Sequence, residues 1–231
     1  MNKVTLYPDK RLTAWGFRYL LFQLLVLPMV LNWLNLLLGL PLDESKINLL
    51  YYTINFAVLV AIFWRFLGAS LQHAQEYLSH VLVAAVVGFF LARFSSTVLD
   101  LAIYAIFPDF FNVNDANIAT MAQSQMPMWA FATIVLVPPV EELLFRGALF
   151  GGLYSRSKVL AWVVSVLSFS LVHVLGYVGV YTWDVLLICF VQYLPAGIFL
   201  ADAYRRSGNI LAPIAIHTAV NAIAMISMAM M

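Results

Sequence analysis

The chain has 231 residues, of which 64% are hydrophobic and only 10% are charged. Soluble domains are about 45–50% apolar and about 25% charged, so this composition excludes an ordinary soluble protein and indicates a polytopic protein of the lipid bilayer. The net charge of +1 gives no general attraction to nucleic acid. The single cysteine, Cys189, excludes an internal disulfide and a cysteine-rich metal cage, and its apolar surroundings favour a small core residue.

Apolar runs of about 20 residues predict the membrane-spanning helices. The predicted spans are Tyr19–Leu40, Asn48–Leu67, His80–Phe107, Met128–Tyr154, Val159–Val180, Val185–Ala203 and Ile210–Met230. The third run is long and carries Arg93 and Asp100, so a break within it, giving eight spans, is an alternative. The sequence therefore predicts an all-α transmembrane helix bundle of about seven spans, which forms a single membrane domain over residues 1–231.

Basic residues predict the orientation of this bundle, because cytoplasmic loops of membrane proteins carry an excess of Lys and Arg. With seven spans and a cytoplasmic N-terminus, nine basic residues lie in inner segments and Lys46 alone lies in an outer one. The inner residues are Lys3, Lys10, Arg11, Arg18, Arg65, Arg156, Lys158, Arg205 and Arg206. An eighth span would reverse one end of the chain, so this distribution favours seven.

The fourth span contains two prolines, Pro138 and Pro139, followed by the carboxylates Glu141 and Glu142. Proline is tolerated in the first turn of a helix and is costly inside one. We therefore expect the helix to break or kink here and to restart with both glutamates in its first turn, where the helix dipole favours negative charge.

A charge at the bilayer centre costs about 2.5–3.5 kcal/mol on insertion scales, so these groups indicate a functional site. Glu142 and Arg146 are four residues apart and should pair on one face of the helix. A buried ion pair that fixes packing is the simpler interpretation and accounts for these two residues. It leaves Glu141, which points about 100° away from Glu142, without a partner. Glu141 is therefore the candidate working carboxylate.

Two later spans carry polar groups at helical spacing. His173 follows Phe169 by one turn in the fifth span, and His217 precedes Asn221 by one turn in the seventh. Each pair taken alone is compatible with simple hydrogen bonding between packed helices. Together with Glu141, however, these residues predict a shared interior site.

The predicted site has the groups that activate water against a carbonyl. A glutamate takes the proton, one histidine orients the water, and the second histidine and the asparagine hold the developing oxyanion. The same three donors, Glu141, His173 and His217, are also compatible with a zinc ion that keeps one position for water. The H-E-x-x-H arrangement is absent, and the sequence leaves both versions open.

The three motifs E-E-x-x-x-R, F-x-x-x-H and H-x-x-x-N occur in order at residues 141–146, 169–173 and 217–221. They resemble those of the CAAX-protease and bacteriocin-processing family of intramembrane proteases, also called the Abi family. The resemblance covers about residues 128–225 and implies a CAAX-protease-like core. It implies that Glu141 is the base, that His173 holds the nucleophilic water, and that His217 and Asn221 stabilise the oxyanion.

By the same resemblance, Glu142, Arg146 and Phe169 would support the site. The family is described both as metalloproteases and as metal-free glutamate proteases, and we favour the second. The short chain is similar to bacterial members, which implies a bacterial plasma membrane and a role in processing or immunity for secreted peptides. Processing of CAAX motifs is not expected to carry over.

Three functions compete on these residues. The first is an endopeptidase that cuts a peptide or membrane-protein substrate. The second is a non-proteolytic membrane regulator or bacteriocin-immunity protein on the same fold. The third is a transporter, in which intramembrane charges form an ion relay. The intact motifs favour the first, while the substrate and the oligomeric state are not predicted.

Overall fold

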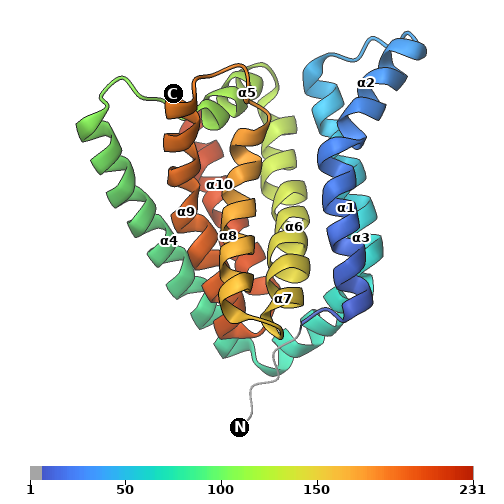
Figure 1. The fold of residues 1–231 in the computed structure, drawn as a ribbon, viewed down its shortest axis with the longest axis vertical. Helices are drawn as coiled ribbons and strands as arrows, with labels where there is room; N and C mark the ends of the chain where they lie inside the picture. Colours follow the sequence, from blue (N-terminus) through green and yellow to red (C-terminus); the bar gives the residue numbers. More distant parts are fainter. Residues whose placement is uncertain (1–6, 231) are drawn as a thin grey trace.

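The computed structural model describes residues 7–230, so the predicted inner residue Lys3 lies outside the described residues. Across this range the secondary structure is helical and includes no strand, which confirms the all-α prediction (Figure 1). The helices stand side by side as a bundle, and the two ends of the chain lie at opposite ends of that bundle.

Six helical segments are long and apolar enough to cross a membrane: α3 (Glu44–Glu76), α4 (Leu78–Ile106), the run Val113–Tyr154, α8 (Lys158–Leu175), α9 (Trp183–Ser207) and α10 (Leu211–Ala229). A seventh span is formed if α1 (Lys10–Leu25) and α2 (Leu27–Leu37) are counted together, because they are joined at a 45° bend. Pro28, which lacks an N–H, lies in the first turn of α2 and accounts for the bend. The alternative of eight spans is wrong, since α4 is unbroken.

The helical run that contains the fourth span starts at Val113, but its backbone is non-helical at Gln125 (φ −148°, ψ 58°), so a kink separates its first part from the predicted span Met128–Tyr154. The run consists of α5 (Val113–Phe131), the π-helical η1 (Ala132–Leu136), α6 (Val137–Glu142), the π-helical η2 (Leu143–Gly151) and α7 (Gly152–Tyr154). Asn112 starts this run, because its side-chain oxygen accepts the backbone N–H groups of Asn114 and Asp115 at 3.0 and 3.2 Å.

The predicted helix break at the prolines is wrong. The N–H of Val137 donates to the carbonyl of Ala132, five residues back, so the chain is in a π-helical register before Pro138. In this register the carbonyl of Thr133 would accept from residue 138, which is a proline and has no N–H. Nδ2 of Asn221 on α10 donates to that carbonyl instead, at 2.8 Å. The prolines therefore shift the register, and Glu141 lies within a continuous helix.

The central helical run packs closely against its neighbours. Every residue of η2 is buried, and its large side chains join the main hydrophobic core with residues of α1, α3, α8, α9 and α10. The contact with α1 is especially close, because a Cβ atom added at Gly16 would lie 2.3 Å from Cβ of Ala148. A glycine is therefore required where α1 crosses η2.

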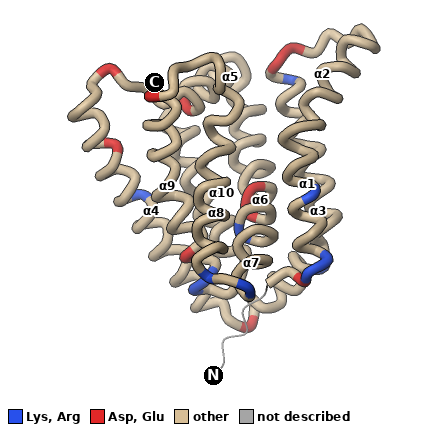
Figure 2. Tube along the Cα trace, in the orientation of Figure 1, with Lys and Arg blue, Asp and Glu red and all other residues tan. Residues whose placement is uncertain are grey.

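Charged residues gather at the two ends of the bundle (Figure 2). The basic end is where α1 begins, and its Lys and Arg residues are Lys10, Arg11, Arg65, Arg156, Lys158, Arg205 and Arg206. The acidic end is where α3 and α5 begin, and it carries Asp43, Glu44, Asp109, Asp115 and Asp184 beside Lys46. The helices alternate in direction between these ends, as a seven-span chain requires, while the cytoplasmic location of the N-terminus stays a prediction.

Candidate active site

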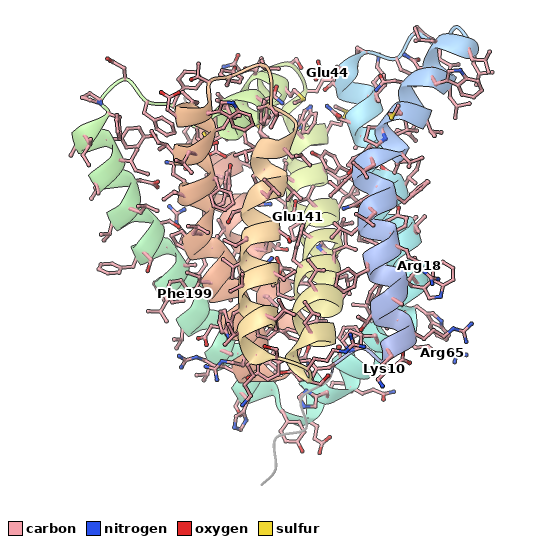
Figure 3. The ribbon with its side chains drawn as sticks, in the orientation of Figure 1. Lys10, Arg18, Glu44, Arg65, Glu141 and Phe199 are labelled. Atoms are coloured by element: carbon pink, nitrogen blue, oxygen red, sulfur yellow. The ribbon has the colours of Figure 1, made fainter. Side chains whose placement is uncertain are left out.

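Glu141 lies about midway between the end marked by Lys10 and the end marked by Glu44 (Figure 3). Its Oε2 is 4.0 Å from Nε2 of His173 on α8 and 3.9 Å from Nε2 of His217 on α10. The side chain of Glu141 is 19% exposed, and Oε2 has no hydrogen-bond partner among the described residues. The structure thus brings the predicted carboxylate and both imidazoles together from three different spans.

Both histidines are held by their other ring nitrogen. Nδ1 of His173 faces the carbonyl oxygen of Phe169 at 2.8 Å, and Nδ1 of His217 faces Oε1 of Glu142 at 2.8 Å. A carbonyl and a carboxylate only accept hydrogen bonds, so each neutral ring carries its hydrogen on Nδ1. Each Nε2 therefore directs a lone pair towards Glu141.

Glu142 forms the buried ion pair that its spacing from Arg146 predicts. Nη1 of Arg146 donates to Oε1 of Glu142 at 3.0 Å, and both side chains are fully buried. Nη2 of Arg146 donates to the carbonyl of Gly197 on α9 at 3.2 Å. Because the same Oε1 also faces His217, this carboxylate connects the ion pair to one of the site's imidazoles.

Phe169 fills the space between the ion pair and the histidines. Its ring lies 4.1 Å from the guanidinium carbon of Arg146, which is a cation–π contact. The ring centroid is 4.8 Å from that of His173 and 5.9 Å from that of His217. Phe169 therefore packs against the ion pair and both imidazoles, and its role as a supporting residue stays a prediction.

Asn221 is at the site but already has one partner. Its Nδ2 donates to the carbonyl of Thr133, as described above. An amide carries two N–H hydrogens, so one donor remains for the cavity that Asn221 lines. Its role in holding an oxyanion stays a prediction. Its hydrogen bond to the carbonyl of Thr133 in the π-helical turn is a structural role that the motif did not indicate.

The site opens into a cavity of about 750 Å³. Its lining includes Glu141, His173, His217 and Asn221, together with Arg93 and Asp100 of α4. A volume of this size lies within the range of about 300–1,000 Å³ that is usual for ligand pockets.

Sequence reasoning missed the aromatic wall beside His173. The ring of Tyr193 on α9 stacks on the imidazole with a centroid distance of 4.0 Å and an interplanar angle of 25°. The hydroxyl of Tyr193 donates to Oδ1 of Asp115 on α5 at 2.9 Å. No local spacing relates these three residues. The only signal was the polar pair Gln192-Tyr193 within an apolar span.

A polar chain continues along the cavity from this wall. Nδ2 of Asn112 donates to Oε1 of Gln192 at 3.0 Å, and Nε2 of Gln192 donates to Oδ1 of Asp100 at 2.9 Å. Asp100 therefore belongs to the cavity wall and has a partner on α9. The cavity has a polar lining well beyond the three motifs.

The spacing of the three donors can be compared with what a zinc ion and a water need. Zinc ligands at about 2.0–2.1 Å in a tetrahedron lie about 3.4 Å apart, whereas these donors are 3.9 and 4.0 Å apart. A water that bonds two groups at about 2.8 Å each suits separations of about 4–5 Å. Across residues 7–230, no group of three or more His, Cys, Asp and Glu is arranged to hold a metal ion. The donor set fits a water better than zinc.

Residues 123–223 match a protein-family model described as type II CAAX prenyl endopeptidase Rce1-like. The matched segment contains all three motifs and agrees with the predicted range 128–225. It confirms the resemblance that the motifs indicated. A search of curated proteins and a search of solved structures each found no match to the chain.

Proposed function

We propose, from the match of residues 123–223 to the Rce1-like CAAX endopeptidase family model, that this protein is an intramembrane endopeptidase in which Glu141 activates water. Its substrate would be a peptide or a membrane protein. The observation that carries the proposal is the spacing of Glu141 Oε2 from the two Nε2 atoms, 4.0 and 3.9 Å, in a cavity whose wall includes further polar side chains. These distances are too long for direct hydrogen bonds and suit one water that donates to Glu141 and to one of the two imidazoles.

The first step of the reaction uses the lone pairs that face this water. The water donates one hydrogen to Oε2 of Glu141 and the other to Nε2 of His173, which leaves an oxygen lone pair free. This lone pair attacks the carbonyl carbon of the scissile peptide bond while Glu141 takes the proton. The product of the step is a tetrahedral oxyanion and a protonated Glu141.

The oxyanion needs donors, and two are available. Asn221 has its second N–H. His217 is a donor only in its imidazolium form, in which Nε2 carries a proton taken up from solvent in addition to the hydrogen on Nδ1. Glu142 accepts from Nδ1 of His217 in either state of the ring. Glu141 then passes its proton to the leaving amine, so the peptide bond and one water become a carboxylic acid and an amine, which exchange a proton to give a carboxylate and an ammonium group.

A metal-free reaction is part of the proposal, and the donor spacing described above supports it. Treatment of purified protein with a strong chelator should leave cleavage unchanged. Loss of cleavage that returns when zinc is added would contradict this part of the proposal and would assign Glu141, His173 and His217 as metal ligands.

The test compares cells that carry the wild-type chain with cells that carry Glu141→Gln, by mass spectrometry of membrane and secreted peptides. The variant keeps the side chain's shape and removes its basic oxygen. The proposal expects cleavage products that depend on wild-type protein and vanish in the variant at equal protein level. Exposed Glu44→Gln is a matched control that should process normally.

Unchanged products in the Glu141 variant would contradict the hydrolase. The remaining reading would then be the non-proteolytic regulator or immunity protein. That protein would bind a partner through the same cavity, and its phenotype would survive loss of the carboxylate.

A further inference from the structure

The cavity reaches one end of the bundle and not the other. On α4 its lining residues run from Arg93 to Tyr104, and on α10 they run from His217 to Met228. Both helices begin at the basic end and finish at the acidic end, where the C-terminus lies (Figure 1). On α5, which begins at the acidic end, the lining starts within the first turn, at Asn114. The opening therefore faces the acidic end.

Towards the basic end, the space beyond Glu141 is packed with large side chains. Phe150, Tyr204 and Ile210 are completely buried there, and none of them is among the described residues that line the cavity. The start of the described chain adds a further cover, since a Cβ atom at Gly151 would lie 3.0 Å from the ring of Tyr7. The site is closed on this side.

The closed end is the one with the Lys and Arg residues (Figure 2). Positive charge in short loops faces the cytoplasm in membrane proteins. The acidic end has Lys46 as its one basic residue within the described chain, and this lysine is already paired with Asp43 at 3.1 Å. The closed end is therefore the cytoplasmic end, and the open end faces the other side of the membrane.

We infer that the substrate reaches Glu141 from the extracytoplasmic side. The substrate class is an exported peptide, or an external segment of a membrane protein, that enters the cavity in an extended form. This inference rests on the proposed function and adds the side from which the peptide bond is presented. A carboxyl terminus in the cytoplasm would meet the packed end of the bundle.

Cysteine labelling tests the inference without any substrate. The background is Cys189→Ala, which removes the single, completely buried native thiol. Single cysteines are then placed in the cavity wall at Ser96 and Val220, in an exposed turn at the basic end at Ser155, and in an exposed turn at the acidic end at Thr182. A charged methanethiosulfonate that does not cross membranes is applied to intact cells and to inside-out vesicles.

The inference expects Ser96→Cys and Val220→Cys to react in intact cells, as Thr182→Cys does, and expects Ser155→Cys to react only in inside-out vesicles. Cavity cysteines that react only from the inside, from both sides or from neither side would overturn it. So would reaction of Ser155→Cys in intact cells, because the bundle would then be inverted.

The same variants separate this inference from the proposed function. Labelling needs no turnover, so it should be unchanged when Glu141→Gln is added. If the cavity is labelled from outside and Glu141→Gln still processes peptides normally, the proposed endopeptidase function is contradicted, while extracytoplasmic access to the cavity is supported. If Glu141→Gln is inactive and the cavity is labelled only from inside, the endopeptidase function is supported and extracytoplasmic access is contradicted. With both correct, labelling Val220→Cys in intact cells should also block processing.

Discussion

The two faces of the turn that carries Glu141 and Glu142 differ sharply. The cavity face has a carboxylate whose Oε2 has no hydrogen-bond partner among the described residues, beside two imidazoles at about 4 Å. The core face has a carboxylate that is fully buried and engages both Arg146 and His217. Both carboxylates leave Oε2 without a hydrogen-bond partner among the described residues, so they differ in burial and in Oε1 of Glu142, which two partners hold. The held carboxylate fixes one of the two imidazoles that face Glu141.

The largest expected effect tests the cavity face. Glu141→Gln should lower the cleavage rate of a substrate found by peptide profiling by about 10²–10⁴-fold, because general-base catalysis contributes about that much. Its unfolding temperature in detergent should stay near that of the wild type, since Oε2 bonds to no described group. A large loss of thermal stability would show that Glu141 also supports the fold and would remove the contrast between the faces.

The core face should respond in the opposite way. Glu142→Gln leaves the buried guanidinium of Arg146 without its charge partner, and breaking a buried pair costs about 3–5 kcal/mol. Lower protein yield and a lower unfolding temperature are expected, measured beside Glu141→Gln as the control. Normal stability with abolished cleavage would contradict the supporting role and would place Glu142 in the reaction.

The packing behind the core face can be tested at a glycine. Gly16→Ala puts a methyl group 2.3 Å from Cβ of Ala148 and should destabilise the protein by about 1–3 kcal/mol, as overpacking does. Gly68→Ala on α3 is the matched control, because nothing lies within 4 Å of its Cβ position. That change should be neutral or slightly stabilising. Equal unfolding temperatures for the two variants would show that α1 does not press against η2.

The smallest effect concerns the aromatic wall of the cavity. Tyr193→Phe keeps the stacked ring on His173 and removes the hydroxyl that donates to Asp115. The same hydroxyl accepts from Nδ2 of Asn114 at 3.0 Å, so at least two hydrogen bonds of about 1 kcal/mol each are lost, and the cleavage rate should fall about fivefold or more. Tyr193→Ala, which also removes the stacking, should lower it further. If both variants cleave at the same rate, the stacked ring does not position His173.

The elements that sequence could predict are those fixed by local spacing. The apolar runs gave the spans, and the separation of four residues gave the pair of Glu142 and Arg146. The motifs placed Glu141, His173 and His217 in one site because polar groups in a bilayer turn to the protein interior.

The features that the sequence did not reveal depend on distant partners. A helix break or kink at Pro138 was the expectation, and the observed register shift needs the amide of Asn221, 88 residues from Thr133. The contact of Tyr193 with Asp115 likewise joins residues 78 positions apart. Neither contact leaves a periodic trace in the chain, so a reading from spacing alone cannot find it.

The hydrogen bond from Asn221 to the carbonyl of Thr133 has a consequence for how the protein folds during its synthesis. Spans leave the ribosome in order, and the turn with Glu141 is made well before α10. Until that last helix arrives, a carbonyl stranded by proline is left without a donor in a medium where water is scarce. In the nascent chain the helical turn before Glu141 therefore lacks one hydrogen bond, and this bond forms only after α10 has inserted. A polypeptide that lacks α10 also lacks His217 and Asn221, so its site is incomplete.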